Sequence, residues 1–238
     1  DGSSNSTTIG TSASMQGEDL KVSGNLSTTH KDAEGNSTTS ATTGTVDVKD
    51  GSATISGTEN LSTTRVDEDG GKVKTDTAGG IMVGDDKFKI DGSRKTTTTS
   101  ADGNATTSGV SGSIGHDHLK VAGEHSETTV NEDGSSDTLG VSGGLNIDGN
   151  KKTATLDGKV TTSHSGADGT KTTESIGGSV SINESGRLGT ITGDRTATET
   201  NGNSSTSRTD SVKIDAEKGT VSVSDELSTA VTNEDGSK

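Results

Sequence analysis

The chain has no cysteine, proline, tryptophan or tyrosine, and Phe88 is its single aromatic residue. The lack of cysteine excludes disulfide bonds and thiolate metal sites. No apolar run is long enough for a transmembrane helix, and no secretory signal sequence is recognisable. Side chains that could stack on bases are missing and the net charge is -15, which argues against nucleic-acid binding. We therefore expect neither nucleic acid nor membrane among the partners.

Large apolar side chains are also scarce. Hydrophobic residues make up 21% of the 238 residues, too few to fill an ordinary core for a chain of this length. Such a composition is typical of disordered chains. Disordered chains, however, seldom lack proline or keep a strict alternating pattern, and this chain does both.

A short turn sequence recurs roughly every 16 or 17 residues, in two alternating kinds. Turns of the first kind are Ala33-Glu34-Gly35, Glu68-Asp69-Gly70, Ala101-Asp102-Gly103, Glu132-Asp133-Gly134, Ala167-Asp168-Gly169, Asn201-Gly202 and Glu234-Asp235-Gly236. Turns of the second kind lie near Gly17, Asp50-Gly51, Asp85, His116-Asp117, Asp148-Gly149, Gly186 and Gly219. One period is about 33–35 residues, which predicts a single array of seven hairpin units over residues 1–238.

Between the turns, apolar and polar side chains alternate, which is typical of a strand with one apolar face. After a turn of the second kind the chain reads apolar-x-apolar-x-Gly, as in Leu20-Val22-Gly24, and before one it reads the mirror image, as in Gly44-Val46-Val48. We predict an all-β antiparallel meander of about fourteen strands, each about 10–13 residues long, without helices. A two-layered β-solenoid is the alternative.

The mirror symmetry can be tested as hairpin pairing, because opposed residues of an antiparallel ladder have numbers with a constant sum. Gly44 opposite Gly57 leaves Asp50-Gly51 as a two-residue loop, with the preferred type I′ chemistry. Four other glycine pairs leave three-residue loops ending in glycine, which predicts type I turns with a G1 bulge. These pairs are Gly24 with Gly44, Gly92 with Gly112, Gly123 with Gly143, and Gly158 with Gly178.

Five further loops differ from these in length or in pairing. Gly193 opposite Asp210 requires an even loop, which Asn201-Gly202 supplies. At Glu68-Asp69-Gly70 the pairing misses by one pair, which predicts a bulge near Gly79-Gly80. The longer loops contain four or six residues. Both numbers are even, so residues of the same face stay opposite each other and the apolar face is preserved. They are Asp148–Thr153, Asn183–Leu188 and Asp215–Thr220.

One predicted face carries two rows of Val, Ile, Leu and Ala, then a glycine row, and becomes Thr-rich beyond it. The Thr positions are Thr28, Thr63, Thr96, Thr129, Thr162 and Thr229. A single sheet with half an apolar face is not stable alone in water. We therefore expect the meander to pack face to face on itself or against another copy, with glycines permitting a close approach. Both strand edges lack proline and are templates for a further chain.

No catalytic, cofactor or metal site is predicted. The acidic turns lack the ligand spacing of calcium loops, and we interpret them as soluble turn formers. A hairpin tip such as His116-Asp117-His118 offers too few ligands for a closed zinc site, and no Ser, His and carboxylate stand together on a sheltered scaffold. The five histidines are His30, His116, His118, His125 and His164. Glycosylation sequons such as Asn25-Leu26-Ser27 and Asn104-Ala105-Thr106 are close to chance.

The stretch Asp69-Gly70-Gly71-Lys72-Val73-Lys74-Thr75-Asp76-Thr77-Ala78-Gly79 resembles barnacle cement proteins of the simple-composition type, rich in Ser, Thr, Gly, Val and Lys. Those proteins are often more basic and can carry cysteine. A weaker likeness is to secreted cross-β silks. Both resemblances imply an extracellular, secreted structural material.

We therefore expect a non-enzymatic protein that assembles with itself into β-rich fibres, as an adhesive or silk-like matrix. Inorganic or other surfaces are further candidate partners, and no cofactor is expected. The alternative function is ice binding by the Thr-rich rows, although Thr is also the best polar strand former.

Overall fold

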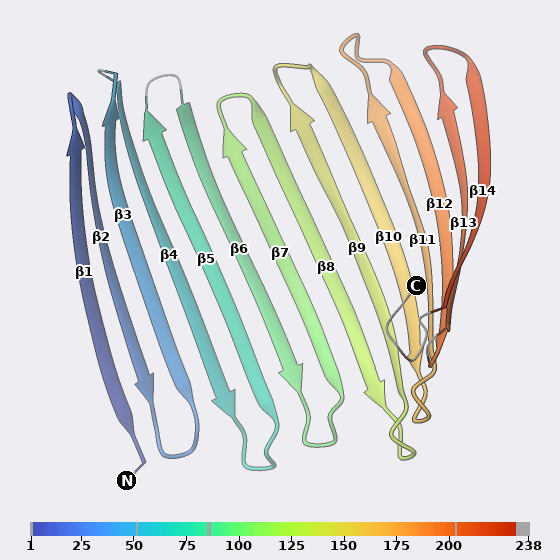
Figure 1. Cartoon of the computed structure of the whole chain (residues 1–238), viewed down its shortest axis with the longest axis horizontal. Helices are drawn as coiled ribbons and strands as arrows, with labels where there is room; N and C mark the ends of the chain where they lie inside the picture. The colour runs from blue at the N-terminus through green and yellow to red at the C-terminus, as the bar shows by residue number, and fades with distance from the viewer. Residues whose placement is uncertain (1, 51, 85–86, 203, 232–238) are drawn as a thin grey trace. The chain divides into compact units, whose positions relative to one another are not determined.

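The computed structural model describes residues 2–50, 52–84, 87–202 and 204–231. Fourteen strands lie in sequence order in one antiparallel sheet, and the described residues contain no helix (Figure 1). The predicted antiparallel meander is confirmed, and the alternative of a parallel solenoid is wrong. The strands are β1 (Ser4–Gln16), β2 (Asp19–Lys31), β3 (Ser37–Lys49), β4 (Ser52–Val66), β5 (Lys72–Gly84), β6 (Lys87–Thr99), β7 (Ala105–Gly115), β8 (His118–Val130), β9 (Ser136–Asp148), β10 (Thr153–Ser165), β11 (Lys171–Ile182), β12 (Leu188–Asn201), β13 (Ser204–Asp215) and β14 (Thr220–Val231).

The chain divides into two compact units. The first consists of Asp1–Ala101 with Thr107–Val121, and the second of Asp102–Thr106 with Ala122–Lys238. Within the described part of each unit, strands contact only the strands next to them in sequence. The Val, Ile and Leu side chains of the described strands also stay exposed or half-buried, so no described strand of a unit covers the face of another strand of that unit. Of the two expected ways to cover the apolar face, folding of the meander on itself is not seen inside either unit.

Four turns of the first kind have three-residue loops that end in glycine. In the turn after β2, the N–H of Gly35 donates to the carbonyl of Asp32, and the N–H of Asp32 donates to the carbonyl of Asn36. The same pair of bonds closes the turns at Gly70, Gly134 and Gly169. These glycines have φ between +83° and +91°, a left-handed conformation that glycine adopts without a steric penalty.

The second kind of turn is only partly described. Asp50 has φ of +50°, as the first position of a type I′ loop requires, whereas Gly51 and Asp85 lie outside the described residues. The last turn of the first kind, Glu234-Asp235-Gly236, also lies outside them. The loops after Asp148 and after Asp215 contain four residues each, because Asp148 pairs with Thr153 and Asp215 with Thr220.

The glycine pairs predicted between neighbouring strands are found for Gly24 with Gly44, Gly44 with Gly57, and Gly158 with Gly178. At two places the prediction is wrong. Gly193 pairs with Val212 rather than Asp210, so the loop begins at Gly202 and not at Asn201. The predicted bulge near Gly79-Gly80 is absent, because β4 and β5 pair without interruption and Gly57 lies opposite Ile81.

Both corrections have one physical reason. A Cβ placed on Gly193 would lie 3.3 Å from Val212 Cγ1, and one placed on Gly57 would lie 3.9 Å from Ile81 Cγ2. In each case a branched side chain from the next strand covers the glycine, whereas the predicted partners would not bring an apolar branched side chain over it. Cross-strand packing of this kind stabilises a sheet, and a shift of two residues leaves every side chain on its face.

A bulge does occur, but in the second unit. The register between β11 and β12 shifts between Val180 and Ile182. The following turn resembles those of the first kind: the N–H of Asn183 donates to the carbonyl of Arg187, and that of Gly186 to Asn183. The pairing of Val180 with Ile191 therefore fits the even-numbered loop predicted for Asn183–Leu188. Beyond the bulge Ile182 lies opposite Leu188, so the loop contains an odd number of residues.

The described residues contain no buried hydrophobic residue. The buried polar residues are Ser135 and Ser175. The stability of each unit thus comes from strand ladders and from side chains that are partly covered by their cross-strand neighbours, and not from a closed core.

Candidate functional surfaces

The first candidate surface is the side of the sheet that carries the Val, Ile and Leu rows, here called the apolar face. In the first unit one row crosses β2 to β6 through Val22, Val46, Ile55, Val83 and Phe88. In the second unit a row crosses β9 to β14. Its members are Leu145, Leu156, Val180, Ile191, Ile214 and Val221. Ile55 is 60% exposed and Leu156 61%, so these rows meet solvent within each unit.

The opposite side, here called the hydroxyl face, is held by pairs of Ser and Thr that are opposed across neighbouring strands. Oγ–Oγ hydrogen bonds join Ser12 with Ser23, Thr43 with Thr58, Ser163 with Thr173, Thr198 with Ser207, and Ser211 with Ser224, at 2.6 to 3.2 Å. Pairs of this type stabilise a sheet by roughly 0.2–1 kcal/mol each relative to alanine pairs. The threonines and serines of this face therefore stabilise the fold that presents them.

Among the strand pairs with a described register, Thr positions on the apolar face form a row in the first unit. Thr38, Thr63, Thr75 and Thr96 are successive partners across β3 to β6. In the second unit Thr162 is flanked by Leu139 and Glu174. A regular hydroxyl-and-methyl lattice thus spans four strands of the first unit, and His30 of β2 follows Thr38 in that row.

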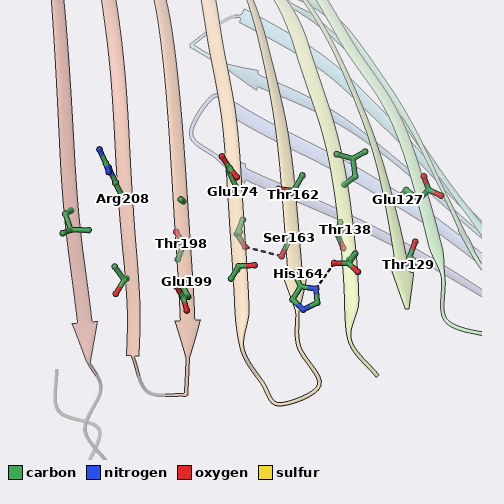
Figure 2. A pocket seen from close by; sticks show the side chains of 17 residues that line it. Glu127, Thr129, Thr138, Thr162, Ser163, His164, Glu174, Thr198, Glu199 and Arg208 are labelled. Carbon is green, nitrogen blue, oxygen red and sulfur yellow. Dashed lines mark hydrogen bonds and ion pairs between the residues drawn. The ribbon is translucent and has the colours of Figure 1, made fainter. Parts of the chain in front are cut away.

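A groove of about 830 Å³ lies in the second unit, on the part of the apolar face near the turns of the first kind (Figure 2). It is lined by side chains from β8 to β14. Its charged members are Glu127, Asp137, His164, Glu174, Glu199 and Arg208. The sequence prediction did not find this groove, because it depends on how the strands of the unit curve.

Several of these charges are paired. His164 Nδ1 and Asp137 Oδ1 lie 2.7 Å apart, and this hydrogen bond is the main cause that lowers the pKa of Asp137. Arg195 Nε donates to Glu174 Oε1 at 2.7 Å. Arg208 Nη2 donates to Asp225 Oδ2 at 3.0 Å. All these groups are exposed, so the pairs contribute little stability and leave a solvated acidic groove.

The histidines considered in the sequence analysis do not form a cluster. His30 Nδ1 lies 2.5 Å from Asn5 Oδ1, in the same kind of cross-strand pair that joins His164 to Asp137, and constant-sum pairing could have found both. His116 Nε2 lies 3.6 Å from Asp117 Oδ1 at the hairpin tip. Ser163 bonds Thr173 on the hydroxyl face and so points away from His164 (Figure 2). Within the described residues no three His, Asp or Glu side chains are grouped closely enough to hold a metal ion.

The acidic turns have a structural role that their composition did not reveal. Asp168 Oδ1 accepts hydrogen bonds from the N–H of Thr170 at 3.0 Å and from its Oγ1 at 2.7 Å, and Asp133 makes the same pair with Ser135. These bonds lower the pKa of both aspartates, with the side-chain hydroxyl as the largest cause.

Asparagines after the turn glycines join one turn to the next. The N–H of Val66 donates to Asn36 Oδ1 and that of Val130 to Asn104 Oδ1, both at 2.7 Å. Asn104 belongs to one of the sequons, so the side chain of this sequon already has a structural partner.

Both outer strands of the sheet are open on one side. β1 pairs with β2 alone and β14 with β13 alone among the described strands. The most exposed large apolar side chains of the described residues lie on these two strands: Ile9 is 73%, Met15 76% and Val223 78% accessible.

No helix of the described residues has the length and apolar character of a bilayer span. Comparisons with protein-family models, curated proteins and solved structures found no match.

Proposed function

We propose that the chain is a non-enzymatic structural protein that assembles with itself into β-rich fibres and acts outside the cell as an adhesive or silk-like matrix. The observation that carries this proposal is the solvent exposure of the apolar rows inside each unit. Exposed contiguous apolar surface marks an interaction site in a soluble protein. A regular row over successive strands suits a partner with the same periodicity, and a second copy of this chain has it.

The strand architecture gives further support. Open edges that lack proline allow a sheet to grow by strand addition. The repeating hydroxyl face would present the same chemistry along the whole length of such an assembly, which suits contact with an extended surface. The secreted location rests on the resemblance to cement proteins and silks.

The test is assembly of purified protein, followed by light scattering and electron microscopy across salt and protein concentration. We expect unbranched fibres whose diffraction shows the strand spacing of about 4.7–4.8 Å. Strictly monomeric protein at high concentration under all conditions would contradict the proposal. Ice crystals grown in the same solutions serve as a second readout, because shaped crystals or thermal hysteresis would favour the four-strand Thr row as the functional surface.

A further inference from the structure

The two open edges differ from the other strands in a way that suits contact between them. β1 reads SNSTTIGTSASMQ and has no charged residue, and β14 reads TVSVSDELSTAV with Asp225 and Glu226 as its only charges. Neither contains a proline or a register shift. Proteins that protect an edge place lysine, proline or a bulge there. β1 thus lacks every protective feature, and β14 has only the carboxylates of Asp225 and Glu226.

The apolar side chains of the two edges have matching spacing. On the apolar face, β1 carries Met15, Ala13 and Ile9, which are opposite Leu20, Val22 and Leu26 of β2. β14 carries Val221, Val223 and Leu227 on the same face, opposite Ile214, Val212 and Arg208 of β13. Within each strand, the three apolar positions are two and then four residues apart. They run in opposite directions along the chain, as an antiparallel pair requires.

Resting on the proposed self-assembly, we propose that β14 of one copy pairs antiparallel with β1 of a second copy in one register. That register places Leu227 opposite Ile9, Val223 opposite Ala13, and Val221 opposite Met15. The two apolar rows of β13 and β14 then run without a break into those of β1 and β2 of the next copy. All 12 residues of β14 find a partner in β1.

The hydroxyl face supports the same register independently. It brings Ser224 opposite Ser12. In the chain Ser224 Oγ is 2.8 Å from Ser211 Oγ, and Ser12 Oγ is 3.0 Å from Ser23 Oγ. The new contact therefore joins two existing hydroxyl pairs into one row of four serines across four strands.

Registers shifted by two residues in either direction are less favourable than the proposed one. A slip of two residues keeps the faces but moves Leu227 opposite Thr7 or Thr11, and it moves Asp225 opposite Ile9 or Ala13. An apolar pair is then lost and a carboxylate lies against an apolar side chain, which is unfavourable. In the proposed register Asp225 lies opposite Thr11 and Glu226 opposite Gly10, where β1 has no side chain.

Disulfide trapping tests the register, because the chain has no cysteine of its own. Single variants Ser12→Cys and Ser224→Cys are mixed under assembly conditions and oxidised, and linked dimers are measured on non-reducing gels. Directly opposed residues have Cβ atoms about 4.5–5.5 Å apart, and diagonal ones about 7–8 Å, beyond disulfide reach. We expect Ser12→Cys with Ser224→Cys to link at least about tenfold faster than Ser12→Cys with Ser222→Cys. The double variant Ser12→Cys/Ser23→Cys in one chain is the positive control.

The outcomes separate this contact from fibre formation. Fibres without the Ser12–Ser224 link, or with equal linking at Ser222, overturn the edge register and leave the proposed function standing. A link formed within single chains of a dilute Ser12→Cys/Ser224→Cys variant overturns the contact between copies. Linked dimers without fibres support the edge contact and contradict the proposed function. If neither the link nor fibres form, both the edge contact and the proposed function are contradicted.

A charge on the edge provides a second test. Ile9→Lys places an ammonium group on the free edge, and the matched variant Asn60→Lys places one on the hydroxyl face of the interior strand β4, where the side chain is exposed. We expect Ile9→Lys to lower the yield of the Ser12–Ser224 link at least about tenfold and Asn60→Lys to change it less than about twofold. Circular dichroism checks that both variants keep their strands. An equal loss for both variants would contradict edge pairing.

Discussion

At the residue scale, two loops of the second unit show what a single glycine contributes. In both, the N–H of a lysine donates to the preceding aspartate Oδ1 at 3.0 Å: Lys151 to Asp148, and Lys218 to Asp215. Both lysine Nζ atoms also lie within 3.4 Å of Oδ2 of the same aspartate. The loops differ at the next position, which is Lys152 with φ of +49° in one and Gly219 with φ of +64° in the other.

Exchange of these two residues gives opposite effects on stability. An L-residue in the left-handed region pays roughly 1 kcal/mol, and glycine pays about 0.5 kcal/mol or more in chain entropy. Lys152→Gly should raise the free energy of unfolding by about 0.5 kcal/mol or less, and Gly219→Lys should lower it by a similar amount. Urea denaturation measures both. Since the space around Gly219 is open, a change of the same sign in both variants would contradict backbone strain as the cause.

At the element scale, the turns determine the register more strongly than the glycine row does. Pairing from the sequence was right where the glycine row and a three-residue turn both favoured it, as for Gly24 with Gly44 and Gly158 with Gly178. At Gly193 the glycine row and an even Asn-Gly loop also agreed, but that pairing was wrong by two residues. At Gly70 the turn and the glycine row required different registers. The three-residue turn kept its geometry, and Gly57 lies opposite Ile81, two residues from Gly79. Patterns along the chain reveal this conflict but not which of the two gives way; in the register that the turn sets, Ile81 packs over Gly57.

The candidate surfaces, too, include features that the sequence predicted and features that it did not. Alternation was enough to assign Ile55 and Leu156 to one face, since each strand reverses its side chains at every residue. It could not assign partners that depend on turn geometry, such as Asn36 with Val66, or the groove that depends on strand curvature. That the apolar rows would stay uncovered within a unit also could not be derived, because composition does not say where a chain bends back.

The turn aspartates should make stability depend on pH in acid. Hydrogen bonds from Thr170 lower the pKa of Asp168 in the folded chain below its ordinary value of 3.8. A group with a lowered folded pKa contributes stability above its unfolded pKa, and that contribution is lost as the pH falls through the folded pKa. Asp168→Ala should therefore destabilise at pH 7, and its difference from the parent should shrink below about pH 4.

Unfolding midpoints measured from pH 7 to pH 2 test this expectation. Asp168→Asn is the matched control, because it keeps an oxygen acceptor for the Thr170 N–H but carries no charge. We expect it to lose less stability than Asp168→Ala at pH 7. A constant difference between Asp168→Ala and the parent over the whole pH range would show that the carboxylate charge does not matter.

At the scale of the whole molecule, the net charge of -15 should slow association. Like charges repel over about 10 Å at 0.1 M salt, so added salt should speed fibre growth. Replacing the turn carboxylates Glu34, Asp102, Asp133 and Asp168 by their amides should speed growth and weaken its salt dependence. Mild acid is a poorer way to remove these charges, because the lowered pKa values of Asp133 and Asp168 keep both ionised.

Fibre growth rates at several salt concentrations measure this effect. The control variant replaces Asp47, Glu59, Asp157 and Asp194, which lie within strands, by their amides and so makes the same change in net charge. A parental rate and salt response in the turn variant would refute the electrostatic barrier. The same acceleration in both variants would assign it to net charge rather than to the turns.

The restriction of contacts within each unit to neighbouring strands has a mechanical consequence. Removal of one hairpin takes no contact away from the hairpins beyond it, so stability grows by nearly equal steps along a unit, as in repeat arrays. Opening by heat or force would begin at an outermost strand and move inward one strand at a time, like a zipper. A material made of such chains would yield gradually and dissipate work at every step, and each released strand could close again against the neighbour it left.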